Sequence, residues 1–167
     1  MKHMEEIYEG LHGLDRMLQR RGITLYLKVV GGAALIFNGI DAIATQDIDT
    51  ITRLEGEIKE ICMECSLDIN DDALDYISNY EGLEFIHDGS NRFFNISISY
   101  LSLGGCIRTK MLDTNPEKLE NLRFLLEEIL HVEMTVDGIV GYMEELGESI
   151  AVQDVETFLA ETEEYGA

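Results

Sequence analysis

The chain lacks the features that mark fibrous, disordered, membrane or disulfide-bonded secreted proteins. It has one proline and 15 glycines in 167 residues, which argues against a fibrous or disordered protein. No segment approaches the ~18 apolar residues that a membrane helix needs, and the start, MKHMEEIYEG, has no apolar core of a secretion signal. Three cysteines cannot all pair within the chain, which favours a reducing compartment. We therefore expect a globular cytoplasmic protein that does not contact a membrane.

Basic residues are also scarce. The chain has 12 Lys and Arg against 33 Asp and Glu, a net charge of −21, and no Lys or Arg follows Arg123. Such a surface repels phosphate backbones and favours solubility, cations or basic protein partners. Nucleic acid is therefore disfavoured as a tightly bound partner. Two interpretations of the acidic surface stay open, a solvated face and a docking surface for a protein partner with a basic surface.

With 46% hydrophobic residues, the chain can bury a proper core in one domain that carries a small helical region. Periodicity and turn residues predict a helix or strand in each of several segments. The expected fold class is α/β (α+β), a mixed sheet flanked by helices. The expected domains are residues 1–112 and an acidic C-terminal helical subdomain, 113–167. The predicted helices are 4–21, 33–39, 54–65, 70–80 and several from 116 onward, the last being 153–164; the predicted strands are 23–30, 47–52, 83–87 and 92–103.

The segment 28–52, KVVGGAALIFNGIDAIATQDIDTIT, carries the clearest chemical signal. Gly31 and Gly32 follow an apolar strand and precede a helix that opens at Ala33. Glycines let a phosphate approach the backbone, and the first N–H groups of the helix face that anion. The segment lacks the G-x-G-x-x-G dinucleotide motif and the Gly-Lys-Ser/Thr of a P-loop.

The second half of this segment brings two carboxylates into a strand. Because side chains alternate along a strand, Asp47 and Asp49 share one face, and we expect Ile48 and Ile51 to serve the core side. Two neighbouring carboxylates repel each other unless a cation lies between them, and Mg²⁺ prefers such oxygen ligands. A phosphate site beside a metal site is the arrangement that phosphoryl-transfer enzymes use.

These residues resemble the signature of the nucleotidyltransferase superfamily (polymerase-β-like fold). The run GGAALIFNG followed by T-x-DID is similar to a branch of small bacterial proteins that includes toxin components of abortive-infection and toxin–antitoxin systems. LDINDDALDYI and RTKMLDTNPEKLENLRFLL resemble further segments of that branch. The resemblance implies a nucleotidyltransferase-type mixed sheet over about residues 25–130.

The resemblance also implies site residues. Gly31 and Gly32 would hold a nucleoside triphosphate (NTP), Asp47 and Asp49 would be catalytic and bind Mg²⁺ (or Mn²⁺), and Lys110 would approach phosphate. The implied activity is transfer of a nucleoside monophosphate to a protein or small-molecule acceptor. The alternative is a catalytically inactive relative that acts as a binding partner in a toxin–antitoxin or defence system.

The sequence departs from the family pattern in two ways. No Lys or Arg lies between Lys28 and Arg53, although relatives carry a basic residue just before T-x-DID. No third acidic residue is evident on the later strand, where the inward positions are Asn95, Ser97 and Ser99 or their neighbours. Glu84 and Asp88 are substitutes without a spacing argument.

The motif CMEC places Cys62 and Cys65 at a spacing that redox and zinc sites use, but the second ligand pair of a zinc site is missing. The pair falls on or near the apolar side of the helix 54–65. We interpret both as buried structural cysteines.

Overall fold

The computed structural model describes residues 1–163. Two compact units divide the chain, Met1–Ser102 and Leu103–Ala167. The division falls before residue 103, whereas the sequence prediction divides the chain after residue 112. Residues 164–167, which include the predicted end of the last helix at Glu164, lie outside the described residues. Among the described residues, none of the helices has both the length and the apolar character needed to cross a membrane.

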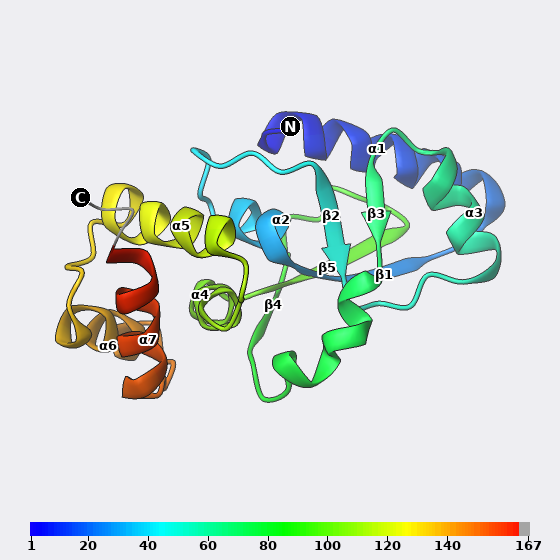
Figure 1. Cartoon of the computed structure of the whole chain (residues 1–167). Coiled ribbons are helices and arrows are strands. Elements are labelled where there is room, and N and C mark those ends of the chain that lie inside the picture. The colour runs from blue at the N-terminus through cyan, green and yellow to red at the C-terminus, as the bar shows by residue number, and fades with distance from the viewer. Residues whose placement is uncertain (164–167) are drawn as a thin grey trace. The chain divides into compact units, whose positions relative to one another are not determined.

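The N-terminal unit is built on a five-stranded mixed sheet with the order β3-β2-β1-β5-β4. The β1–β5 and β2–β3 pairs are parallel, and the β1–β2 and β4–β5 pairs are antiparallel. This arrangement, shown in Figure 1, confirms the predicted fold class. The strands are β1 (Leu25–Val30), β2 (Asp47–Thr50), β3 (Asp68–Asn70), β4 (Phe85–His87) and β5 (Ile96–Leu101).

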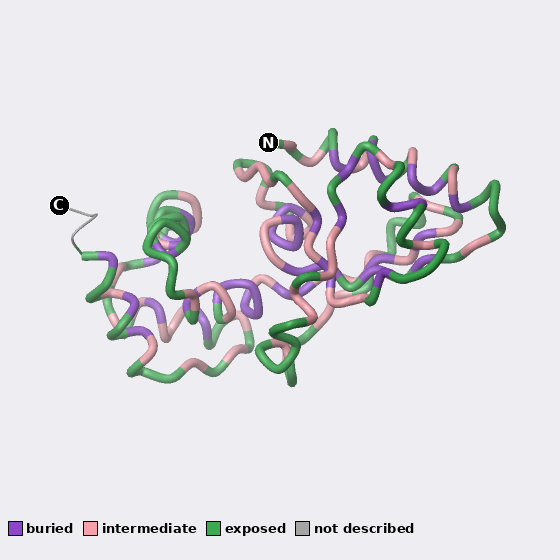
Figure 2. The backbone as a smooth tube through the Cα atoms, turned by 45° about the vertical axis from the view of Figure 1, so that its right-hand side comes forward, coloured by how far each residue is buried: buried purple, intermediate pink, exposed green. Residues whose placement is uncertain are grey.

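Helices cover one face of this sheet. The helices of the unit are α1 (Met4–Arg21), α2 (Gly31–Phe37), α3 (Gly56–Glu64) and the 3₁₀ helix η1 (Asp72–Tyr80). α1 contacts α3, and α2 contacts β1, β2 and β5. Buried residues recur along one side of α1, as Figure 2 shows, because its apolar side chains repeat every three or four positions. α1 ends at Gly22, whose left-handed conformation (φ 66°) confirms the predicted helix end.

The other face of the sheet, here called the open face, carries polar side chains. Leu25, Leu27 and Val29 of β1 are buried on the covered face, so the alternate residues Tyr26 and Lys28 lie on the open face. The strand pairing then assigns the residues of the neighbouring strands to the same side. The polar residues of the open face are Tyr26, Lys28, Asp47, Asp49, Asp68, Asn70, Ser97 and Ser99, with Phe85 and His87 of β4 on the same side.

A buried carboxylate fixes the start of β5. Asp15 on α1 is 3% exposed and accepts hydrogen bonds from the backbone N–H groups of Phe94 (3.0 Å) and Asn95 (2.7 Å). Gln19 donates a third, at 3.0 Å. Because these amides bond to α1 rather than to a strand, β5 begins at Ile96, later than the predicted start at residue 92.

Three other sequence predictions need correction. β3 was not predicted, and the predicted helix 70–80 is a 3₁₀ helix that starts at Asp72, with no buried residue and a non-helical Tyr76. The buried Ile69 pairs with Ile48, so tertiary pairing overrides local helix propensity. Ile51 does not serve the core side, because alternation from Ile48 gives that position to Thr50. Thr50 is fully buried, and its hydroxyl donates to the Lys28 carbonyl at 2.7 Å.

The C-terminal unit is helical, as predicted. Its elements are α4 (Leu103–Met111), α5 (Pro116–Phe124), the π-helical turn η2 (Leu125–Ile129), α6 (Val136–Glu145) and α7 (Val152–Thr162). Asn115 caps α5 and Thr135 caps α6 through their side chains. The core comprises Leu119, Leu122, Leu126, Ile139, Met143, Val155 and Phe158.

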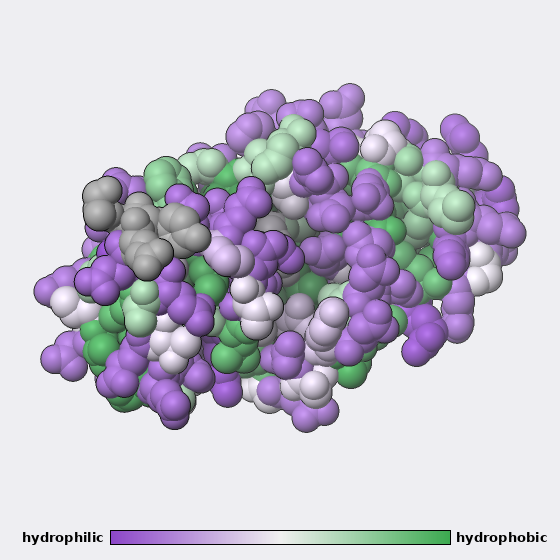
Figure 3. Space-filling view, in the orientation of Figure 1, coloured by the Kyte–Doolittle hydropathy of each residue, from purple (hydrophilic) through white to green (hydrophobic). Residues whose placement is uncertain are grey.

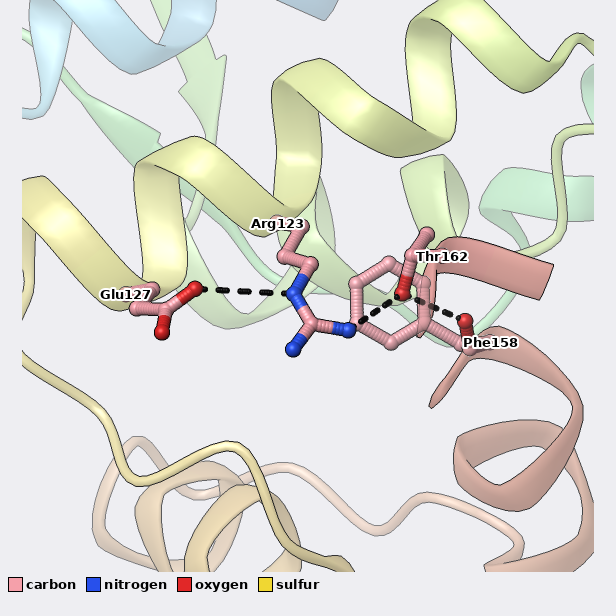
Figure 4. A network of polar contacts seen from close by, with 4 residues as sticks. All are labelled: Arg123, Glu127, Phe158 and Thr162. Carbon is pink, nitrogen blue, oxygen red and sulfur yellow. Dashed lines mark hydrogen bonds and ion pairs between the residues drawn. The ribbon is translucent and has the colours of Figure 1, made fainter. Parts of the chain in front are cut away.

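A polar contact joins α5 to α7 in this unit. Arg123 donates to the Thr162 hydroxyl at 3.0 Å, and Thr162 donates in turn to the Phe158 carbonyl at 2.8 Å (Figure 4). Arg123 also pairs with Glu127 at 3.5 Å. The last basic residue of the chain therefore has a structural role between two helices.

Candidate nucleotide and metal site

The junction between β1 and α2 approaches β2 closely. Gly31 has a φ of +66°, and a Cβ on it would lie 2.7 Å from Oδ2 of Asp49. A Cβ on Gly32 would lie 3.0 Å from the Thr45 hydroxyl. A side chain at Gly31 would therefore be both strained and in conflict with the carboxylate. Gly31 thus brings its backbone directly beside an aspartate of the predicted site, and Gly32 lies against the loop that leads into that strand.

The two aspartates lie on the open face of β2, half-buried, while Ile48 and Thr50 are buried behind them. Asp49 is opposite Val30 of β1 on one side and Asn70 of β3 on the other. The Asn70 amide donates to Oδ2 of Asp47 at 3.4 Å. The predicted positions of the pair, side by side on one strand face, are confirmed, and their binding role stays a prediction.

The approach to β2 is fixed by backbone pairing with the N-terminal residues. Lys2 and Thr45 exchange two backbone hydrogen bonds, of 2.7 and 2.9 Å, and the Thr45 hydroxyl donates to the Asp47 carbonyl at 3.0 Å. These bonds hold the loop that leads into Asp47. The carboxylates are thus carried by a strand whose entry is tied down, which suits a preorganised site.

Lys28 joins this face, although the sequence analysis did not assign it to the site. It lies two residues before Val30 on β1, about 7 Å along the strand, and its ammonium is 5.4 Å from the centre of the Phe85 ring. The alternation in LYLKVV could have placed Lys28 on the face of Tyr26. That Lys28 shares a face with Asp49 follows from the β1–β2 register, which the sequence alone does not give.

The open face of β5 carries hydroxyls where active members of the superfamily would bring a third carboxylate. Ser97 is opposite Tyr26, and Ser99 is opposite Lys28. The third predicted inward position, Asn95, donates its side-chain amide to the Ile23 carbonyl at 3.0 Å. None of the three expected inward positions on this strand is acidic, whereas Asp68 of β3 is opposite Asp47 on the same face of the sheet.

The two substitute acids occupy other settings. Glu84 is exposed and precedes β4. Both oxygens of Asp88 accept hydrogen bonds from Ser90, from its N–H at 3.2 Å and from its hydroxyl at 3.0 Å. Within residues 1–163, no group of three or more His, Cys, Asp and Glu side chains is arranged to hold a metal ion.

The donor set therefore fits one kind of metal site. Asp47 and Asp49 are two oxygen ligands on adjacent same-face positions, beside a backbone that a phosphate can reach. Mg²⁺ is commonly held by one or two carboxylates, with waters and substrate phosphates completing its shell. The residues fit a metal brought in with a nucleotide and do not form an all-protein cage.

Lys110, the remaining predicted phosphate contact, lies on α4 in the C-terminal unit. It is half-buried, near the buried Cys106 thiol. Its part in phosphate binding stays a prediction.

The cysteines behave as buried thiols. Burial raises the pKa of Cys62 to about 11 and that of Cys106 to about 12, so both are protonated at neutral pH. Cys65 donates to the carbonyls of Cys62 (3.0 Å) and Leu67 (3.3 Å). Cys62 is buried in α3, as the structural interpretation expected, whereas Cys65 is the C-cap residue after α3 and is only half-buried.

A mixed sheet with one open face, a glycine pair at the end of β1 and two aspartates on β2 define a nucleotidyltransferase-like protein. The family model described as nucleotidyltransferase of unknown function (DUF6036) matches residues 3–101. The chain belongs to this family. The match covers the sheet and the whole candidate site apart from Lys110. No curated protein and no solved structure matches the chain significantly.

Proposed function

We propose that this protein binds an NTP together with Mg²⁺ or Mn²⁺ at Gly31, Gly32, Asp47 and Asp49. One observation carries the proposal: the Gly31 backbone lies directly against the Asp49 carboxylate. A triphosphate on the glycine turn would then meet a metal held by the aspartates. Phosphate and metal sites are coupled in this way in phosphoryl-transfer proteins.

The residues of the open face have separate roles in this proposal. Asp47 and Asp49 hold the metal, and the Asn70 amide orients Asp47. Lys28, on the same face, neutralises phosphate charge and supplies the cation that the sequence lacks before Thr45. When bound, Mg²⁺ would stabilise negative charge on the phosphate oxygens.

The reaction that such a site would support is transfer of a nucleoside monophosphate, and we expect this activity to be weak or absent. An acceptor hydroxyl attacks the α-phosphorus, pyrophosphate leaves, and the hydroxyl proton must pass to a base. On β5, Ser97 and Ser99 stand where that base would be expected, and a neutral hydroxyl is a poor base. General-base help is worth ~10²–10⁴ in rate, so its loss favours binding over turnover.

The acidic surface supports a protein partner whether or not the protein transfers nucleotides. With a net charge of −21, a partner with a basic surface would be attracted at long range. An active protein would use such a partner as its acceptor. A silent protein would act as a binding partner in a cytoplasmic toxin–antitoxin or defence system, the role that its resemblance implies.

Nucleotide binding is tested by thermal unfolding of the full chain with ATP, GTP, CTP and UTP, each with and without Mg²⁺. A ligand at a hundred times its Kd adds about 2.7 kcal/mol to the free energy of unfolding. We expect a rise in melting temperature with at least one nucleotide, only when Mg²⁺ is present. The double substitution Asp47→Asn with Asp49→Asn should abolish it and leave the unliganded fold as stable or more stable, because a like-charge pair is removed.

The matched control is Asp41→Asn with Asp137→Asn, two exposed aspartates outside the site whose removal changes the net charge equally. This variant should keep the full response. The proposal is wrong if no nucleotide stabilises the wild type, or if the two double variants respond alike. Robust transfer by the wild type that survives replacement of Glu84 and Asp88 would contradict the weak-transfer part alone.

A further inference from the structure

A second site candidate lies at the other end of the sheet. A cavity of about 290 Å³ is lined by residues of the β4–β5 connection, by the start of β5 and by Tyr26 of β1. This volume is near the lower end of small-molecule sites. Tyr26 lies four residues before Val30, about 13 Å along β1, so the cavity is separate from the aspartate pair.

Arg92 gives the cavity an unpaired cation. Its guanidinium lies 4.3 Å from the centre of the Tyr8 ring, which holds it in place. Within residues 1–163 it takes part in no ion pair, since the four ion pairs use Arg21, Arg108, Lys118 and Arg123. In a chain with 33 acidic residues, a guanidinium that lines a cavity without a carboxylate partner favours an anionic ligand.

The one carboxylate that lines the cavity is already engaged. Both oxygens of Asp88 accept hydrogen bonds from Ser90 in the same turn. His87, at the end of β4, adds an imidazole that can donate a hydrogen bond. Arg92 and His87 therefore place hydrogen-bond donors at the cavity, among amide and hydroxyl side chains that can donate or accept.

The edge of β5 adds a backbone donor. The pairing of β4 with β5 ends where Asp88 donates to the Ile98 carbonyl at 2.8 Å. Alternate residues of a strand turn their N–H groups toward the same neighbour, so Ile96 turns its N–H toward the cavity. Among the described residues, no strand pairs with Ile96 on that edge.

The wall of the cavity is rigid, and its aromatic rings are exposed. Asp15 fixes the backbone of Phe94 and Asn95 from the buried side. Phe94 is 88% exposed and Tyr26 is 68% exposed, so neither ring serves the core. Aromatic faces held by a fixed backbone can stack on a planar ligand with little loss of entropy.

We propose that this cavity binds a small ligand that combines a planar ring with a phosphate or carboxylate group. The anionic group contacts Arg92 and the Ile96 N–H, and the ring stacks on Phe94 or Tyr26. This site is independent of the proposed nucleotide and metal site, so an experiment can contradict one proposal and leave the other intact.

The test is a titration of the ¹⁵N-labelled full chain, followed by amide chemical shifts in EDTA so that no divalent metal contributes. AMP supplies ring and phosphate, 4-hydroxybenzoate supplies ring and carboxylate, and ribose 5-phosphate and adenosine supply one part each. We expect saturable shifts in residues 91–97 with AMP or 4-hydroxybenzoate at millimolar concentration, and weaker binding of the partial ligands. Comparison of the two shows which combination of ring and anionic group the cavity binds more tightly.

Arg92 and Phe94 are both exposed, so substitutions at these positions test the proposed contacts without changing the buried core. Arg92→Gln should weaken binding about tenfold or more, because a charge-assisted hydrogen bond is lost. Phe94→Ala should weaken binding about threefold or more, because stacking is lost.

Arg53→Gln and Phe124→Ala are matched controls elsewhere on the surface. They and the Asp47/Asp49 double variant should bind as the wild type does. Absence of shifts in residues 91–97 with all four probes, or equal affinity for Arg92→Gln and Arg53→Gln, would overturn the proposal.

Discussion

Among single residues, Asp15 contributes most visibly to the architecture of the N-terminal unit. Its carboxylate is buried on α1 and accepts three hydrogen bonds, two of them from the backbone that leads into β5. Buried carboxylates are rare unless their hydrogen bonds are satisfied. Asp15 therefore couples α1 to the strand that lies beside β1.

The substitution Asp15→Asn tests this coupling. An asparagine of the same shape turns an N–H₂ group toward one of the two backbone N–H donors, which leaves that donor without an acceptor. We expect a loss of about 1–3 kcal/mol in the free energy of unfolding, measured by urea denaturation. Asp41→Asn, at an exposed position, should change it by less than about 0.5 kcal/mol. Equal stability of the two variants would show that Asp15 does not hold β5.

At the scale of elements, the junction of β1 and α2 joins fold and site. The strand ends at Val30, the helix starts at Gly31, and the turn between them lies against Asp49. The same glycine that allows the turn also allows the carboxylate to approach. We therefore expect stability and the proposed nucleotide binding to be linked at this junction.

Gly31→Ala should reveal this link when it is compared with Gly39→Ala. Both glycines have positive φ, +66° and +91°, but only Gly31 has an atom within 4 Å of an added Cβ. In each variant the free energy of unfolding should fall by about 1–2 kcal/mol, because alanine is disfavoured at positive φ. Only Gly31→Ala should also displace Asp49 and reduce the thermal stabilisation by Mg²⁺ and nucleotide. If both variants kept the full nucleotide response, the close approach would have no role in binding.

The sequence predicts elements well where local patterns decide them. The end of α1 at Gly22, the strand–glycine–helix–strand order and the hairpin of β4 and β5 all follow from local periodicity and turn residues. β3 and η1 were missed or misassigned because β3 is only three residues long and forms through pairing with β2. Local patterns do not encode such pairing.

For the candidate site too, local patterns could place some residues, whereas others depend on tertiary contacts. Asp47 and Asp49 could be placed on one face from alternation alone, because strand periodicity is local. Lys28, Arg92 and Asp15 could not be assigned their roles, because these depend on strand register or on a loop that meets a helix. Ile51 was misplaced because alternation from Ile48 gives the next core-side position to Thr50, not to Ile51.

At the scale of the whole molecule, charge is the dominant property. The face seen in Figure 3 is largely hydrophilic, with hydrophobic residues in separate patches. A net charge of −21 attracts divalent cations nonspecifically, so metal binding by itself is weak support for a site. Any test of the metal site must therefore hold the net charge constant.

The most direct test of the central claim is Mn²⁺ binding, followed by the electron paramagnetic resonance signal of free Mn²⁺. The wild type, Asp47→Asn with Asp49→Asn, and the charge-matched Asp41→Asn with Asp137→Asn are titrated at the same ionic strength. We predict one class of tight sites in the wild type and in the charge-matched variant, and its loss when Asp47 and Asp49 are replaced. Equal Mn²⁺ binding by the Asp47/Asp49 variant and the wild type would contradict the claim that this pair of aspartates is a metal site.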